Sequence, residues 1–136
     1  MPCKYVIAQE GKVVIERWTG TVSRQELMAH KKQQALDPSI KENASVLSDC
    51  TSAVFALSPD DISKISAMDT GPDKDPKITR YAFLVNDDTY DSARQFSDQV
   101  NKGGKSVIIF TSLEVASLWL GLDASTVREL IAGADG

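Results

Sequence analysis

The chain has 136 residues, of which 42% are hydrophobic and 25% charged, and its formal net charge is -4. This length and balance fit one globular domain over residues 1–136 and exclude a disordered chain or a disulfide scaffold. The acidic charge argues against a nucleic-acid partner, because such binding draws much of its free energy from Lys and Arg side chains that neutralise phosphates.

No apolar run is long enough for a signal peptide or a membrane span, so we expect a cytoplasmic protein without an integral membrane segment. The two cysteines, Cys3 and Cys50, form no C-x-x-C motif and are too few for a disulfide framework. We therefore expect two free thiols.

The first predicted elements are two strands, over residues 4–8 and 13–18, which are rich in β-branched and aromatic residues. The segment Gln9-Glu10-Gly11-Lys12 between them predicts a hairpin turn in which Gly11 supplies an unusual φ angle. We expect Trp18 to serve in packing rather than as a ligand platform.

Three helix starts are marked by capping patterns, in which a Ser or Thr is followed three residues later by an acid. They precede predicted helices over 24–36, 59–68 and 112–120, the second of which carries Pro59 at its first position. The capping pairs are Ser23 with Glu26, Ser58 with Asp61, and Thr111 with Glu114. On the third helix we expect a wide buried stripe of Val115, Leu118, Trp119 and Leu122.

The remaining predicted elements are strands over 45–49, 78–85 and 106–110 and helices over 89–102 and 124–132, with a breaker-rich loop over 69–77. The order favours an α/β fold with one mixed sheet of about five strands, an N-terminal hairpin and then parallel strands, flanked by four to five helices. Such sheets bind ligands at the carboxyl ends of their strands, where this chain places a polar, acidic rim.

Two kinds of chemistry at that rim are considered and set aside. Asp49, Asp87 and Asp88 could bind a hard cation, but the two latter acids are more simply explained as caps of the helix that follows them. Asp49, Cys50 and Thr51 could form a nucleophile site with His30. We interpret His30 as a solvated imidazole on a polar helical face and Cys50 as a buried thiol, and predict no catalytic residue, metal or cofactor.

Three segments, VLSDCTSAVFALSPDDI, RYAFLVNDDTYDSARQF and IIFTSLEVASLWLGL, together resemble the SpoIIAA-like (STAS/SEC14-like) family. The resemblance implies a non-enzymatic regulatory or protein-interaction module, similar to anti-sigma-factor antagonists, and allows for a homodimer. Its alternative implication is a carrier or sensor of a small hydrophobic ligand such as a lipid or fatty acid. Leu57-Ser58-Pro59-Asp60 replaces the Asp-Ser-Ser/Thr-Gly segment of phosphorylated antagonists, which leaves open whether Ser58 is phosphorylated.

The candidate ligand or partner surface lies around the segment 50–57, which we interpret as an exposed connection between a strand and a helix. Its apolar residues are explained either by core packing or by a hydrophobic pocket under a flexible flap. The candidate residues are Asp49, Thr51, Val54, Phe55, Leu57, Ser58, Ile62 and Asp87.

Overall fold

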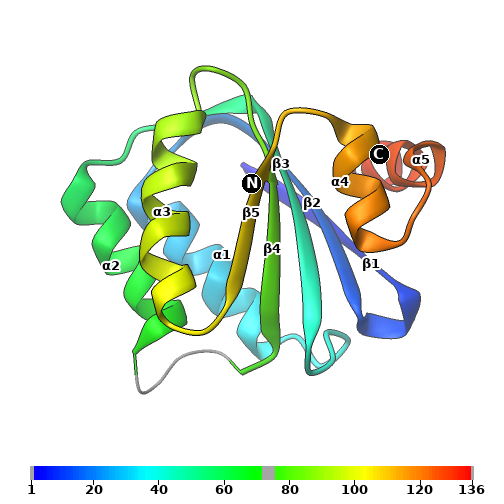
Figure 1. Ribbon diagram of the computed structural model, residues 1–136, viewed down its shortest axis with the longest axis horizontal. Helices are drawn as coiled ribbons and strands as arrows, with labels where there is room; N and C mark the ends of the chain where they lie inside the picture. Colours follow the sequence, from blue (N-terminus) through cyan, green and yellow to red (C-terminus); the bar gives the residue numbers. More distant parts are fainter. Residues whose placement is uncertain (1, 72–75, 136) are drawn as a thin grey trace.

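The computed structural model describes residues 2–71 and 76–135 (Figure 1). The described strands are β1 (Cys3–Ala8), β2 (Val13–Val22), β3 (Ala44–Phe55), β4 (Ile78–Leu84) and β5 (Ser106–Phe110). The helices are α1 (Arg24–Leu36), α2 (Pro59–Thr70), α3 (Tyr90–Lys102), α4 (Leu113–Leu120) and α5 (Ala124–Asp135), with a 3-10 turn, η1 (Gln9–Gly11), between the first two strands. None of the described helices combines the length and the apolar character that crossing a membrane requires.

The five strands form one mixed sheet in the order β1-β2-β3-β4-β5. β1 is antiparallel to β2, and each later pair of neighbours is parallel. This confirms the predicted α/β fold class. The parallel pairing begins with β2 and β3, because α1 crosses from the end of β2 to the start of β3.

The helices form a layer on each face of the sheet, with α1, α2 and α3 on one face and α4 and α5 on the other (Figure 1). Side chains alternate between the two faces along each strand, so neighbouring residues of a strand pack into different hydrophobic clusters. Val14, Val46 and Tyr81 pack with α2 and α3, whereas Ile15 and Leu47 pack with α4 and α5. The central strands are therefore buried on both sides.

The capping signals at the first two helices are confirmed. Ser23 accepts a hydrogen bond from the backbone N–H of Glu26, Ser58 accepts one from Asp61, and both acids return a bond to the cap. The prediction for α4 was wrong by one residue. Its cap is Ser112, whose hydroxyl accepts from the backbone N–H of Val115 at 3.3 Å, because Thr111 lies one position too early.

The predicted buried stripe on α4 was also wrong in part. Val115 and Leu118 are 52% and 75% exposed, and the face that meets the sheet carries Ala116 and Ser117. Trp119 and Leu122 do pack against the core of that layer. Apolar residues surround most of this short helix, so their spacing could not indicate which side the sheet would cover.

The segment 50–57 is not an exposed connection, which corrects the interpretation from sequence. β3 continues to Phe55 because residues 52–55 pair in parallel with 19–22 of β2, beyond a register shift near Trp18. Polar Thr51 and Ser52 hide this extension in the sequence, although Ala53 is buried and Val54 exposed as a strand requires. The predicted loop over 69–77 begins inside α2, and its residues 72–75 lie outside the described part.

Candidate functional site

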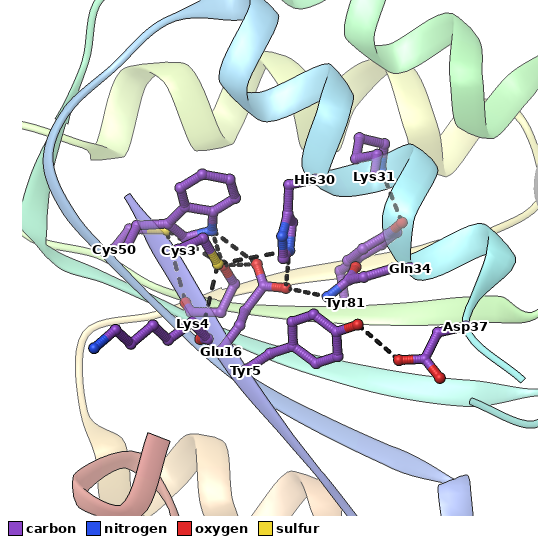
Figure 2. Close-up of polar contacts among 12 residues, drawn as sticks. Cys3, Lys4, Tyr5, Glu16, His30, Lys31, Gln34, Asp37, Cys50 and Tyr81 are labelled. Atoms are coloured by element: carbon purple, nitrogen blue, oxygen red, sulfur yellow. Dashed lines mark hydrogen bonds and ion pairs between the residues drawn. The ribbon is translucent and has the colours of Figure 1, made fainter. Parts of the chain in front are cut away.

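Glu16 is a buried carboxylate on β2 that faces α1, and it is only 5% exposed. Its Oε2 accepts hydrogen bonds from Trp18 Nε1 at 2.8 Å and from the Ser48 hydroxyl at 2.7 Å. Its Oε1 accepts one from Gln34 Nε2 at 2.8 Å and lies 3.0 Å from His30 Nε2 (Figure 2). Four partners thus use the acceptor sites of the carboxylate.

The environment of Glu16 keeps the carboxylate ionised. Burial by itself would raise its pKa, because a charged group loses its hydration in the interior. The charge of His30 and the hydrogen bonds from His30, Ser48 and Gln34 outweigh this effect and lower the pKa of Glu16 to about 2.

His30 is buried rather than solvated, which corrects the prediction from sequence. It is 4% exposed, and its ring meets the rings of Trp18 and Tyr5 edge to face, with centroids 4.8 and 5.6 Å away. The inner face of α1 carries Leu27, His30 and Gln34 at helical spacing. Two of these three residues are polar, so this face was mistaken for a solvent-facing one.

A cavity of about 80 Å³ lies between this cluster and the helices α2 and α3. One part of its lining is polar and comes from the cluster, namely Glu16, His30, Gln34 and Ser48. The remainder is mostly apolar and includes Trp18, Leu27, Phe55, Leu57, Ile62, Ile65, Phe83 and Phe96. Residues from the sheet and from the helices α1–α3 therefore enclose a cavity that is polar on one side and apolar on the other.

The structure brings three of the sequence-predicted site residues to this cavity: Phe55, Leu57 and Ile62. Val54 is 55% exposed on the other face of β3 and does not line it. Ser58 caps α2, as described above. Three of the four apolar candidates thus line the cavity, and none of the polar candidates does.

The polar candidates Asp49 and Thr51 lie in the middle of β3, and Asp87 follows the carboxyl end of β4. Asp49 Oδ1 accepts from the backbone N–H and the hydroxyl of Thr51 at 3.0 and 2.6 Å, and Asp87 is exposed. The predicted cap of α3 by Asp87 and Asp88 was wrong. The N-cap residue is Thr89, and no side chain among the described residues caps α3. The side chain of Asn86 stabilises the turn before the helix, where it accepts from the backbone N–H of Asp88 and of Thr89 at 3.0 and 3.2 Å.

Cys3 Sγ lies 3.5 Å from His30 Nε2, which raises the question of a nucleophile and a base. In a catalytic relay the base uses one ring nitrogen for the nucleophile and the other for the orienting carboxylate. Here the same nitrogen faces both groups. Burial, together with the nearby charge of Glu16, also raises the pKa of the Cys3 thiol, so this arrangement disfavours the thiolate.

A second buried ionic cluster lies beside the first. Asp69 of α2 is 1% exposed and pairs with Lys31 at 2.5 Å and with Lys105 at 2.8 Å, while the Tyr81 hydroxyl donates to it at 3.0 Å. Lys31 also donates to Tyr81 at 3.0 Å. Lys31 of α1 is therefore held by an ion pair against α2 and β4 instead of extending into solvent.

Sequence reasoning missed Glu16, Gln34 and the burial of His30. One signal was available, since the neighbours of Glu16 on the same face of the strand, Val14 and Trp18, are both apolar. A charged residue in such a place requires a buried partner. The spacing of His30 and Gln34 on one helical face is compatible with that partner, but does not identify it.

No family model and no curated protein matches this sequence. The fold is similar to the crystal structure of an uncharacterized protein of the DUF3478 family from Shewanella loihica PV-4, described as having a SpoIIAA-like fold. The two chains are 15% identical, the match covers 87% of this chain and 91% of that one, and the TM-score is 0.55. The chain therefore has a SpoIIAA-like fold, as its sequence segments predicted.

Proposed function

We propose that this protein is a non-enzymatic binding module that takes a small ligand with an apolar body into the cavity between the sheet and helices α1–α3. The observation that supports this proposal is the convergence of five aromatic and five aliphatic side chains on one cavity. Pockets for small molecules typically combine such a lining with a few fixed polar groups.

The size of the cavity limits the ligand. One water molecule needs about 10–15 Å³ of such space, so about 80 Å³ accommodates a short alkyl segment or a single ring. A whole lipid would require the helices to move apart. A short fatty acid or alcohol that inserts its chain is the ligand class that fits best.

The polar side chains around Glu16 in the lining are already hydrogen-bonded to its carboxylate, which favours a ligand that binds through apolar contacts. Glu16 has its acceptor sites occupied by Trp18, Gln34, Ser48 and His30, so an additional polar group of a ligand would have to displace one of these. Such an exchange leaves a buried donor unpaired at a cost of about 1–3 kcal/mol. We therefore infer that affinity comes from burial of the ligand's apolar surface.

Trp18 lines the cavity and provides a direct test. In a Trp119→Phe background, Trp18 is the only remaining tryptophan, since the chain has two. Titration with hexanoate, octanoate and 1-octanol is expected to change its fluorescence with a saturable dependence on concentration. The absence of saturation with every probe would refute the proposal.

A matched pair of variants separates the cavity from general effects on the fold. Ala93 lines the cavity from α3, so Ala93→Leu fills part of it and is expected to weaken probe binding at least tenfold. Ala132→Leu adds the same atoms at an exposed position of α5 and should leave binding unchanged.

The second candidate function is a protein-interaction module that forms a homodimer. The observation that favours it is the exposure of apolar side chains on α4 and on the edge strand β5, where Leu118 and Val115 are joined by Ile108, which is 38% exposed. A second copy of the chain could cover these residues. Sedimentation velocity should then show a concentration-dependent dimer that Leu118→Glu abolishes, and a monomer at all concentrations would exclude this candidate.

A further inference from the structure

We propose that Cys3, Glu16 and His30 form a binding site for a zinc-type divalent cation. The three side chains come from β1, β2 and α1, so only the tertiary structure brings them together (Figure 2). One donor atom of each lies within 4.8 Å of the other two, and all three residues are buried. This inference does not rest on the proposed apolar ligand, although Glu16 and His30 line the same cavity.

The spacing of two of the three donor pairs is close to that of a tetrahedral centre. With ordinary zinc bond lengths, a sulfur and a nitrogen that bind the same ion lie about 3.5 Å apart, and a nitrogen and an oxygen about 3.3 Å. The structure has 3.5 Å between Cys3 Sγ and His30 Nε2, and 3.0 Å between His30 Nε2 and Glu16 Oε1. These two pairs need shifts of only a few tenths of an ångström, and in the third pair the Cys3 sulfur and a Glu16 carboxylate oxygen lie within 4.8 Å and would move closer on binding.

The position of His30 Nε2, next to both Glu16 and Cys3, suits a shared cation as well as the hydrogen bond to Glu16. If Nε2 carries a proton, the N–H can point well at the carboxylate or at the sulfur, but not at both. If it carries none, its lone pair faces the lone pairs of Glu16 across 3.0 Å. A cation between the three donors uses all three lone pairs at once.

The surroundings of Glu16 are those of a supported metal ligand. Trp18 and Ser48 donate to Oε2 and Gln34 donates to Oε1, so the carboxylate keeps its position when His30 Nε2 turns from its hydrogen bond to the ion. Hydrogen bonds of this kind orient metal-binding side chains and raise affinity.

The donor set also indicates which cation would bind. A thiolate and an imidazole select zinc-type ions over magnesium and calcium, which require oxygen ligands. Binding converts the Cys3 thiol to a thiolate, whose proton passes to solvent, and needs a neutral imidazole with a free lone pair on Nε2. An imidazolium releases its Nε2 proton to solvent, whereas a neutral ring that carries its proton on Nε2 takes up the proton on Nδ1 instead. Glu16 and His30 line the cavity, which provides both access and room for a water molecule as the fourth ligand.

Cobalt(II) serves as a spectroscopic probe for the site in tag-free protein. Equimolar cobalt is expected to produce a thiolate-to-metal charge-transfer band and the strong visible absorption of tetrahedral cobalt, and zinc should abolish both. Cys3→Ser should remove the charge-transfer band. Cys50→Ser is the matched control, because Cys50 is also buried and free but lies outside the donor set, and it should retain the band.

Two further measurements keep the result interpretable if a variant does not fold. X-ray absorption of zinc-loaded wild-type protein should show one sulfur and two or three nitrogen or oxygen ligands, whereas two sulfurs or none would overturn the assignment. A wild-type protein without the charge-transfer band would also overturn it. Ala93→Leu should still bind cobalt, so loss of the apolar ligand and loss of the metal can be told apart.

Discussion

His30 Nε2 lies 3.0 Å from Glu16 Oε1, and both side chains are buried under the aromatic ring of Trp18 and the helix α1. Removing one residue of a buried charge pair typically lowers the free energy of unfolding by about 3–5 kcal/mol, because the other charge stays buried without a partner. Removing both residues lowers it by less than the sum of the two single effects.

The first prediction concerns this pair. In the presence of a chelator, His30→Ala and Glu16→Ala are each expected to lower the free energy of unfolding by about 3–5 kcal/mol. The double variant should be less destabilised than the sum of the two. Urea unfolding followed by tryptophan fluorescence measures all three, and additive effects would contradict a direct interaction.

The second prediction concerns pH. Burial would raise the pKa of Asp69, but Lys31 and Lys105 outweigh it and hold the pKa below its ordinary value of 3.8. Because the folded pKa is the lower one, this carboxylate stabilises the fold above pH 3.8 and the contribution is lost as the pH falls below that value. Stability measured between pH 7 and 3 should therefore decline with acid.

Asp69→Asn is expected to destabilise the protein by about 3 kcal/mol at pH 7 and to flatten this decline, because the neutral amide cannot pair with two ammonium groups. Asp98→Asn, at an exposed position of α3, is the control and should leave the pH profile unchanged. An Asp69→Asn profile parallel to that of the wild type would argue against the assigned role.

The third prediction tests the capping boxes. Ser23→Ala and Ser58→Ala each remove a side chain that accepts from the first turn of its helix, and each should cost about 1 kcal/mol. Ser58→Asp should retain most of the stability, because Asp also caps helices. Thermal unfolding measures the losses, and Ser63→Ala, exposed on the same α2, should change stability by less than about 0.5 kcal/mol.

The fourth prediction compares two glycines with positive φ. At Gly11, with φ of +92°, an added Cβ would lie 2.5 Å from the backbone oxygen of Ser39, whereas at Gly104, with φ of +97°, it would meet nothing within 4 Å. Both Ala variants bear the strain of this backbone conformation, which is of order 1–3 kcal/mol. Gly11→Ala should be the less stable by at least about 1 kcal/mol, and equal stabilities would show that the turn relaxes.

Local signals in the sequence predicted several elements well because their causes are local. β5 has the predicted bounds, Ser106–Phe110, and the caps at Ser23 and Ser58 depend only on residues three positions apart. Gly11 adopts the positive φ expected of the turn. The five-stranded mixed sheet followed from the order of these elements.

Contacts between segments distant in the sequence determined two features that local patterns did not predict, namely the length of β3 and the buried face of α4. The second half of β3 exists because residues 19–22 of β2 lie beside it, and neither segment by itself has the composition of a strand core. Similarly, the buried face of α4 was selected by the sheet rather than by its own apolar residues.

The sequence by itself determined the α/β fold with a mixed sheet, through apolar runs, turns and caps that act within a few residues, and the resemblance of three segments indicated its SpoIIAA-like type. Only the tertiary structure decided that Glu16, His30 and Cys3 meet, since they come from three elements and their polar character favours exposure when each is considered separately. Burying them is favourable only when the partners arrive together, because an interior carboxylate requires donors that no short segment can supply. The same applies to Lys31, which lies in the interior because Asp69 of another helix balances its charge.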